Sequence, residues 1–230
     1  MVPKHIGIIL DGNRRFAKKL MLKPWKGHEW GAKKVEKLFE WCRELDIKEL
    51  TLYAFSLENL SRPKEELDYL INIFKDEFSK LLSDERIDKD EIRINFIGRL
   101  WMLPADLQDI MQKVMKKTEK YGRHIVNFAM AYGGRAEIID AARKIADKAI
   151  KGEIDINSIN EDVFSQHLYL SSRPDLIIRT GGEKRISGFL LYQGDYAELC
   201  FVDKMWPEFE KQDLVNAIND YAERDRRFGR

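Results

Sequence analysis

The segment HIGIIL, residues 5–10, is a short apolar run that ends abruptly at the carboxylate of Asp11. Such a run, rich in isoleucine and bounded by polar residues, is typical of a strand buried on both faces of a sheet. Five further runs of this kind alternate with four longer stretches whose apolar residues recur at helical spacing. The predicted strands are His5–Leu10, Glu49–Phe55, Arg93–Ile97, Ile125–Ala131, Asp175–Arg179 and Glu198–Val202, and the predicted helices are His28–Leu45, Pro63–Leu82, Pro104–Tyr121 and Ala136–Lys151.

This alternation predicts an α/β fold in which helices cover a mostly parallel sheet. Each helical stretch is long enough to cross over the sheet between two parallel strands. No glycine/serine linker, internal repeat or low-complexity tract interrupts the pattern, and the charged run Asp84–Glu91 indicates an exposed connection. We therefore expect residues 1–230 to form a single domain.

The composition excludes several classes of protein and several kinds of partner. The chain has 230 residues, of which 44% are hydrophobic and 34% charged, a mix that excludes a disordered chain, a collagen-like repeat and a disulfide scaffold. Forty Lys and Arg against 39 Asp and Glu leave a formal charge of +1. No overall field attracts such a protein to nucleic acid, so we expect no nucleic-acid partner and only local anion sites.

The cysteines and the N-terminal residues predict a cytoplasmic location. Cys42 and Cys200 lie far apart, lack the spacing of metal ligands and fall within apolar patterns, so we expect buried free thiols in a reducing compartment. The first ten residues are too short and too weakly charged to match a signal peptide or a membrane span.

Three of the predicted strands are followed by unusually polar segments. These segments are DGNRRFAK from residue 11, SLENLSRP from residue 56 and RTGGEKRISGFLLYQ from residue 179. In open α/β sheets, ligands bind beyond the carboxyl ends of the strands. We therefore expect the three segments to surround one polar crevice.

The first two segments each allow a functional and an ordinary interpretation. In the first, Gly12 permits close backbone approach, and the amides and arginines after it would attract phosphate. Alternatively, Asp11 caps a helix and the arginines face solvent. The second segment offers hydroxyl, amide and guanidinium donors before Pro63, but serine, asparagine and proline are also ordinary residues at the start of a helix.

The third segment carries a more specific signal. Arg179, Arg185 and Ser187 surround the Gly181-Gly182 turn and provide two forked cations and a hydroxyl suited to a diphosphate. Downstream, Glu198 is a candidate second carboxylate for a hard cation such as Mg²⁺, although it is equally an ordinary charge at a strand end.

Taken together, these residues indicate chemistry between two phosphorylated molecules. They provide two arginine-bearing anion cradles and a pair of carboxylates, and no obvious nucleophile. One face of the second predicted helix is apolar and would either line a channel for a hydrocarbon or pack in the core. The residues of that face are Leu67, Leu70, Ile71 and Phe74.

The three polar segments closely resemble the successive motifs of the cis-prenyltransferases, the undecaprenyl and dehydrodolichyl diphosphate synthases. The resemblance is carried by HIGIILDGNRRFAK, TLYAFSLENLSRP and DLIIRTGGEKRISGFLLYQGDYAEL, and it extends from about His5 to the closing RRFG. Arg14 stands where bacterial members commonly have glycine, which makes the first motif more similar to archaeal or eukaryotic members.

The resemblance implies a fold, a reaction and partners. The fold would be a six-stranded parallel sheet with an apolar tunnel between sheet and helices, in a homodimer. The reaction would be the Mg²⁺-dependent cis addition of isopentenyl diphosphate units to a farnesyl or geranylgeranyl diphosphate starter. The product would be a long polyprenyl diphosphate such as undecaprenyl diphosphate, a glycosyl carrier lipid precursor, and its release would involve peripheral contact with a membrane.

The resemblance also implies roles for single residues. Asp11 would be the essential Mg²⁺-linked carboxylate, with Glu198 contributing to the metal, and Asn59 is the residue to which the family assigns proton acceptance. A side-chain amide is a very weak base, so we expect a departing diphosphate oxygen to accept the proton and Asn59 to position substrate. The substrate-binding residues would be Gly12, Asn13, Arg14, Arg15, Phe16, His28, Ser56, Glu58, Arg62, Arg179, Arg185, Ser187, Arg227 and Gly229, with Phe16 beside the starter chain and the last two reaching the partner subunit.

Two further departures from the family pattern limit this transfer. Pro24 stands where many members have an arginine, so Lys23 or Lys26 would have to supply that charge. Lys184 stands where bacterial members have a metal-linked histidine, and a protonated lysine cannot bind a metal.

Three other functions fit the residues less well. A haloacid-dehalogenase-type phosphohydrolase needs a second aspartate where Asn13 stands. A trans-prenyltransferase needs two aspartate-rich motifs in a helical bundle, and only Asp84–Asp88 approximates one, within a stretch expected to be a solvated loop. A non-catalytic subunit of a two-component prenyltransferase would typically lack the motif that begins at Asp11.

Overall fold

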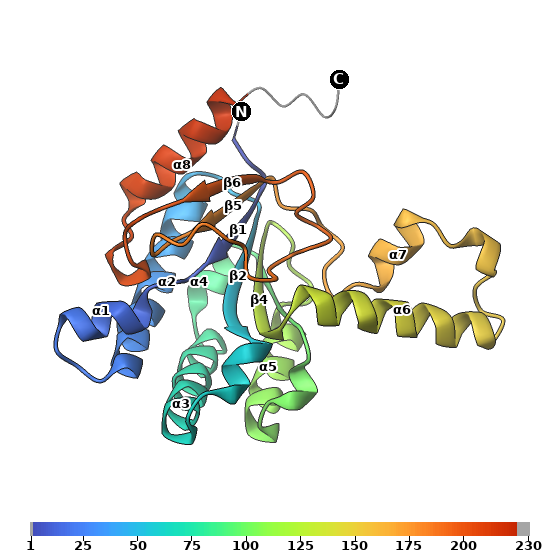
Figure 1. The fold of residues 1–230 in the computed structure, drawn as a ribbon, viewed down its shortest axis with the longest axis horizontal. Coiled ribbons are helices and arrows are strands. Elements are labelled where there is room, and N and C mark those ends of the chain that lie inside the picture. The colour runs from blue at the N-terminus through green and yellow to red at the C-terminus, as the bar shows by residue number, and fades with distance from the viewer. Residues whose placement is uncertain (1, 225–230) are drawn as a thin grey trace.

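Six parallel strands form the sheet at the centre of the structure, a computed structural model that describes residues 2–224 (Figure 1). Their order across the sheet is β3-β4-β2-β1-β5-β6, and every neighbouring pair is parallel. The strands are β1 (His5–Ile9), β2 (Glu49–Ser56), β3 (Ile92–Ile97), β4 (His124–Tyr132), β5 (Leu176–Arg179) and β6 (Glu198–Phe201).

The strands are apolar on both faces because both faces of the sheet are covered. In β1 all five residues are buried, and Ile8 and Ile9 belong to different hydrophobic clusters on opposite faces. One face carries the large cluster, to which α2, α3, α5 and α8 contribute, and on the other face the ring of Tyr53 stacks on Phe189 with centroids 4.9 Å apart. The helices are α1 (Asn13–Lys19), α2 (Gly27–Glu44), α3 (Lys64–Leu81), α4 (Glu85–Lys89), α5 (Ala105–Thr118), α6 (Gly134–Ile150), α7 (Glu161–His167) and α8 (Lys211–Glu223).

The structure confirms the α/β fold, the six predicted strands and the four predicted helices, with ends that differ by a few residues. Two expectations were wrong. The run Asp84–Glu91 is more than an exposed connection, because it contains α4, whose Ile87 is buried in the core. Cys42 is buried as expected, whereas Cys200 is only half-buried, and both are free thiols.

The sheet order brings the three polar segments together. β1 lies between β2 and β5, and these are the three strands that precede the segments. Because the strands are parallel, their carboxyl ends lie at one edge of the sheet. The described residues contain no helix long and apolar enough to cross a membrane.

A buried carboxylate anchors the loop that carries the third segment. Glu137 on α6 accepts hydrogen bonds from the backbone N–H of Tyr169 at 2.8 Å and of Leu170 at 3.2 Å, from the side-chain amide of Gln193 at 2.9 Å, and from the hydroxyl of Tyr132. Burial raises the pKa of Glu137, and these donors partly offset the rise. The network fixes the position of Gln193, which lies in the same loop as Arg185.

Replacing Glu137 with alanine is expected to lower the free energy of unfolding by about 2–4 kcal/mol, because several buried donors lose their acceptor. Glu137→Gln keeps one oxygen for the amide donors, and its amide can donate to Tyr132, so a loss of about 1 kcal/mol is expected. Urea unfolding measures both values, with the exposed Glu161→Ala as a control. Equal stability of the two Glu137 variants would contradict this account of the network.

Candidate active site

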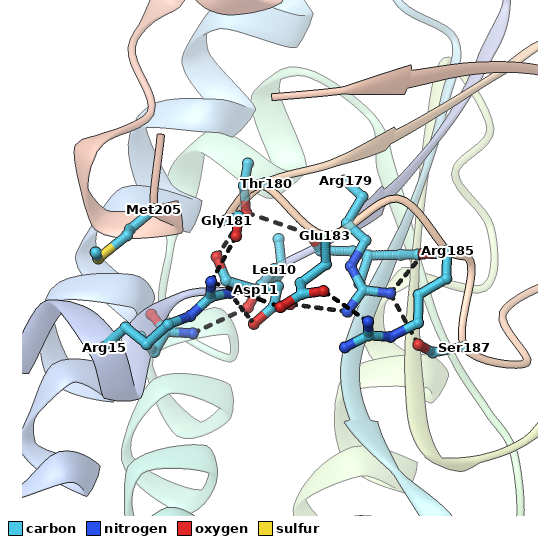
Figure 2. A network of polar contacts seen from close by, with 12 residues as sticks. Leu10, Asp11, Arg15, Arg179, Thr180, Gly181, Glu183, Arg185, Ser187 and Met205 are labelled. Carbon is cyan, nitrogen blue, oxygen red and sulfur yellow. Dashed lines mark hydrogen bonds and ion pairs between the residues drawn. The ribbon is translucent and has the colours of Figure 1, made fainter. Parts of the chain in front are cut away.

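The carboxylate of Asp11 is the meeting point of the first and third polar segments (Figure 2). Its oxygens lie 2.8 Å from Nη2 of Arg179 and 3.2 Å from Nη2 of Arg15. Burial alone raises the pKa of Asp11, but the hydrogen bond from Arg179 and the charge of Arg15 outweigh it, so the pKa is lowered. Asp11 is therefore an ionised carboxylate held in place by two guanidinium groups.

Two glycines make this close approach of backbone segments possible. Gly12 has φ 109°, and a Cβ there would lie 2.8 Å from the backbone of Met205. Gly181 has φ 87°, and a Cβ there would lie 2.6 Å from Nη2 of Arg15. Arg15 uses the space to donate a hydrogen bond of 2.6 Å to the carbonyl of Gly181. The glycines of both motifs are thus required by sterics at the site.

Arg179 at the end of β5 organises the loop behind it. It is 5% exposed, and its Nη1 donates to the carbonyl of Arg185 and, at 2.8 Å, to the hydroxyl of Ser187. Its buried Nε–H has no hydrogen-bond partner within residues 2–224. Arg179 therefore joins Asp11 to the loop and keeps one buried donor without an acceptor in residues 2–224.

Glu183 lies between two arginines of the site (Figure 2). It is 2.6 Å from Nη1 of Arg185 and 3.9 Å from Nη1 of Arg15. All three side chains are partly exposed, and exposed ion pairs contribute little. Glu183 is therefore easily displaced from the two arginines by a more highly charged anion.

The second segment joins the site through a cluster that the sequence analysis only partly foresaw. Nη1 of Arg62 lies 3.3 Å from Nε2 of His28 and donates to Glu66 at 2.9 Å, and Nε of Arg14 is 3.5 Å from the same carboxylate. Glu66 is buried on α3. Glu66 was not predicted from the sequence, because Arg62 precedes α3 in extended conformation and spacing within a helix did not indicate the pair.

His28 is neutral in this cluster. Burial, followed by the charges of Arg62 and Arg14, lowers the pKa of His28 to about 3. Between about pH 6.5 and pH 3 the unfolded chain binds a proton at this residue that the folded chain does not. The contribution of His28 to the free energy of unfolding therefore decreases as the pH falls through this range.

The variant His28→Gln is expected to lose less stability between pH 6.5 and pH 5 than the wild type does. The slope of the free energy of unfolding against pH should differ between the wild type and His28→Gln by an amount that approaches about 1.4 kcal/mol per pH unit, the value for one proton. Chemical unfolding across this range measures it, with His167→Gln as a control for loss of an imidazole elsewhere. Identical slopes for the wild type and His28→Gln would show that the imidazole is not held neutral.

Two adjoining cavities open at this edge of the sheet. The larger, of about 600 Å³, has Asp11, Asn59, Arg179 and Arg185 at its polar end and continues between α2 and α3 along apolar side chains. Those side chains include Val35, Phe39, Leu70, Phe74 and Phe128. The smaller, of about 360 Å³, is lined by Leu10–Arg15, Lys18, His28 and Arg62. Leu10, Asp11, Asn13, His28 and Arg62 line both cavities.

The apolar face predicted on the second helix serves both of its expected roles. All four residues, Leu67, Leu70, Ile71 and Phe74, belong to the large hydrophobic cluster or pack against it, and Leu70 and Phe74 also line the larger cavity. The wall of the channel is therefore also part of the core.

Neither lysine expected to supply the charge of the missing arginine lines a cavity. Lys23 pairs with Glu65, Lys26 contacts Glu29 and Tyr69, and neither lines a cavity. Lys18, which the sequence analysis overlooked, lines the smaller cavity instead. It follows Arg14 by one helical turn, which was the signal available in the sequence.

Several predicted residues lie away from the cavities. Phe16 contacts Trp30 edge-on at 5.9 Å and lines neither cavity, nor do the exposed side chains of Glu58 and Lys184. Ser187 reaches the site through Arg179. Ser56 and the backbone of Gly12 do line a cavity. Arg227 and Gly229 lie outside the described residues.

Within one chain, Glu198 does not approach Asp11. Glu198 begins β6 and pairs through β5 with Ile6, whereas Asp11 follows the other end of β1. Glu198 is therefore level with Ile6, and Asp11 comes five residues after Ile6, a distance of about 16 Å along an extended strand. Glu198 instead pairs with Arg224 at 2.7 Å. The expectation that Glu198 and Asp11 hold the same ion is therefore not met by a single chain.

Asn59 has a structural partner for its amide oxygen. The backbone N–H of Ser56 donates to Oδ1 of Asn59 at 3.2 Å, at the start of the short helical turn Leu57–Ser61. The side chain still lines the larger cavity. This arrangement leaves the NH₂ group of Asn59 as its available hydrogen-bonding group.

The donors at this edge fit one magnesium ion shared with substrate. No group of three or more His, Cys, Asp and Glu side chains in residues 2–224 is arranged to hold a metal. Mg²⁺, however, is commonly bound by one or two carboxylates together with substrate phosphates and water. The ionised Asp11, at the junction of the two cavities, meets that requirement.

Comparisons with known proteins agree with this geometry. A sequence model for the family described as "Putative undecaprenyl diphosphate synthase" matches residues 9–229. Proteins named tritrans,polycis-undecaprenyl-diphosphate synthase (geranylgeranyl-diphosphate specific) are similar to the whole chain: those of Pyrococcus horikoshii and Methanopyrus kandleri are both 48% identical, and the match spans 88% and 85% of their lengths.

Solved structures show the same fold. The structure of lavandulyl diphosphate synthase from Lavandula x intermedia, in complex with dimethylallyl diphosphate, superposes with a TM-score of 0.92 at 35% identity over 100% of this chain and 99% of that one. A probable undecaprenyl diphosphate synthase from Campylobacter jejuni gives 0.82 at 33% identity over 99% of each chain. The chain therefore belongs to the undecaprenyl diphosphate synthase family and is a prenyltransferase.

Proposed function

We propose that this prenyltransferase adds isopentenyl diphosphate units in cis configuration to geranylgeranyl diphosphate, yielding a polyprenyl diphosphate of about undecaprenyl length. The observation that carries the proposal is the larger cavity, whose charged mouth continues into an apolar channel between α2 and α3. Such a cavity suits a ligand with a diphosphate head and a growing hydrocarbon tail. The choice of starter and product rests on the names of the archaeal relatives.

The main task of the protein is to stabilise a departing diphosphate. Cleavage of the allylic carbon–oxygen bond places positive charge on the hydrocarbon and negative charge on the diphosphate. Arg14, Arg15, Lys18 and Arg62 surround the smaller cavity and provide fixed donors for that charge. Preorganised donors of this kind contribute several kcal/mol in a transition state. We assign the allylic diphosphate to this cavity.

Arg179 and Arg185 are assigned to the diphosphate of isopentenyl diphosphate. Both line the larger cavity, next to Asp11. When this second anion binds, we expect Arg185 to exchange Glu183 for the diphosphate. Holding the alkene beside the allylic carbon gives the entropic advantage of a near-attack geometry.

Asp11 is the residue that would hold Mg²⁺. When bound, Mg²⁺ would supply positive charge to the leaving oxygen. The charge of Asp11 is available for this because Arg179 and Arg15 keep it ionised. Loss of a proton then completes the new double bond, with a diphosphate oxygen as the acceptor. Asn59 orients the substrate through its NH₂ group.

The apolar channel stabilises the growing chain and limits its length. Each buried CH₂ contributes about 0.8 kcal/mol. At the end away from the charged mouth, the cavity is lined by Glu77, Lys80, Asp84 and Arg86. A hydrocarbon tail that reaches these charged side chains gains nothing further from burial. We therefore assign the limit on product length to this end.

Replacing Val35 with phenylalanine narrows the channel and is expected to shorten the main product by one or more isoprene units, with the initial rate changed less than about 3-fold. The reason is that the larger ring occupies space needed by the tail but lies away from the charged mouth. Thin-layer or mass analysis of the products measures it. Ile150→Phe, on the exposed end of α6, is the matched control. An unchanged product length from Val35→Phe would show that the channel does not limit the length of the product.

The purified chain alone, incubated with Mg²⁺, isopentenyl diphosphate and either farnesyl or geranylgeranyl diphosphate, tests the function. We expect long cis products, more of them from geranylgeranyl diphosphate, and no reaction with EDTA. Sedimentation of the active protein tests the proposed homodimer. Absence of turnover by the chain alone would favour a non-catalytic subunit, and trans products would contradict the proposed reaction.

A further inference from the structure

The turn after α1 exposes three consecutive apolar side chains, Leu20, Met21 and Leu22. Trp30 on α2 is also exposed, and its ring contacts Phe16 on α1. We call these five residues the apolar hook. Runs of consecutive exposed apolar residues are unusual on a protein surface, and they mark sites that bind another molecule or a membrane.

The backbone of the apolar hook is well ordered but unfavourable for a large side chain. The N–H of Met21 donates to the carbonyl of Lys18, and the N–H of Leu22 to that of Ala17, both at 2.9 Å. This is the Schellman pattern, in which the residue at the position of Met21 is usually glycine. Met21 has φ 57° and is 94% exposed. The chain thus keeps a large apolar group where glycine would be less strained.

The charges around the apolar hook are predominantly positive. Residues 13–26 contain six Lys and Arg and no Asp or Glu. Lys19, Lys23 and Lys26 pair with Glu208, Glu65 and Glu29 of other elements, but these lysines are exposed and such pairs are weak. Lys33, one turn after Trp30, is exposed and has no ion pair among residues 2–224. An anionic surface is therefore complementary to this face.

The apolar hook also adjoins the mouth of the active site. The side chains of Arg14, Arg15 and Lys18 on α1 line the smaller cavity, and the exposed Leu20, Met21 and Leu22 of the hook follow directly at the end of the same helix. Figure 1 shows α1 and its following turn at the edge of the molecule, away from the sheet. A surface that contacts the hook therefore lies beside the cavity assigned to the allylic diphosphate.

We propose that the apolar hook docks the enzyme on a lipid membrane with anionic headgroups. Met21, Leu22 and Trp30 enter the interfacial layer, where tryptophan is favoured, while the surrounding lysines contact headgroup phosphates. The role of this docking rests on the proposed function, because a long-chain allylic diphosphate and its polyprenyl product are both amphiphiles that reside at a membrane. Docking at the cavity mouth shortens the path that the substrate and the product travel between the membrane and the active site.

Co-sedimentation of the full chain with lipid vesicles, without any substrate, tests the proposal. We expect binding to phosphatidylcholine vesicles that contain phosphatidylglycerol and weaker binding to phosphatidylcholine alone. Met21→Gly should weaken binding to the anionic vesicles by about 10-fold, since one buried apolar side chain is lost. Its melting temperature should stay equal or rise, because glycine relieves the strained backbone. Ile150→Gly, which removes an 87% exposed side chain from α6, should bind as the wild type does.

Three outcomes would overturn the proposal: no binding of the wild type to anionic vesicles, equal binding by Met21→Gly, or a Met21→Gly variant that changes self-association in sedimentation velocity but not vesicle binding. The last would identify the hook as a protein contact. Catalysis is measured separately, in vesicle-free solution, where Met21→Gly should retain wild-type turnover. An inactive wild type whose vesicle binding depends on Met21 would refute the proposed function and leave the docking proposal intact.

Discussion

The variant Asp11→Ala is expected to lose about 10³-fold in turnover while remaining folded. Two effects combine in this loss. Among residues 2–224, Asp11 is the only carboxylate that lines both cavities, and the variant removes it together with the proposed Mg²⁺ ligand. Arg179 and Arg15 also lose the anion that sets their positions. A factor of 10³ corresponds to about 4 kcal/mol of transition-state stabilisation.

The variant Asp11→Asn separates the two effects. Its amide oxygen still accepts hydrogen bonds from the arginines but carries no charge. If the charge serves Mg²⁺, Asp11→Asn should be nearly as inactive as Asp11→Ala, and the residual activity should need a higher Mg²⁺ concentration. Single-turnover assays over a Mg²⁺ series measure both quantities, with the exposed Asp147→Ala as the control. Near-normal turnover by Asp11→Ala would remove the metal assignment.

The fold was predictable because one physical signal dominates the sequence. Apolar runs such as residues 5–10 need burial on both faces, and only a helix-covered parallel sheet provides it. A helix start after Gly12 was foreseen without the extent of α1, and the segments missed were α4, α7 and α8. Two of these three are short, and the pattern of α4 was obscured by charges because only Ile87 on it is deeply buried. The signal is weakest where an element rests on few apolar contacts.

The candidate site was predictable to the extent that it follows strand ends. Asp11 closes its apolar run and Glu198 opens another, so in a parallel sheet they lie at opposite edges. This argument was available from the sequence, and it would have separated the two carboxylates. Glu66 and Lys18 were harder to identify, because each lies within a helix rich in charge and only packing shows which charged residues face inward.

The role of Phe16 beside the starter chain stays a prediction, because its motif does not set the direction of its side chain. Phe16 follows the arginines directly, yet α1 turns its ring toward Trp30 and away from both cavities. One residue along a helix changes the direction of a side chain by about 100°. Position in a motif therefore does not determine which side of the helix faces the ligand.

Replacing Arg179 with alanine is expected to raise the KM for isopentenyl diphosphate about 100-fold and to change the KM for the allylic diphosphate far less. The guanidinium is nearly fully buried, and it has three roles. It pairs with Asp11, holds the carbonyl of Arg185 and the hydroxyl of Ser187, and keeps a free Nε–H facing no protein acceptor in residues 2–224. Losing a buried charged donor of this kind costs several kcal/mol.

Two further variants decide how Arg179 acts. Arg179→Lys can keep a charge near Asp11 but cannot hold the loop at the same time, because lysine lacks the planar fork. Ser187→Ala removes one loop contact and leaves the guanidinium in place. If Arg179 binds the diphosphate directly, Ser187→Ala should raise the KM less than about 5-fold, and Arg179→Lys should be intermediate. If Arg179 only holds the loop, Arg179→Lys should be as defective as Arg179→Ala.

The exposed Arg143→Ala is the control for lost charge. An allylic KM that rises as much as that of isopentenyl diphosphate would contradict the assignment of Arg179 to the second substrate, because the two cavities would then depend on it equally.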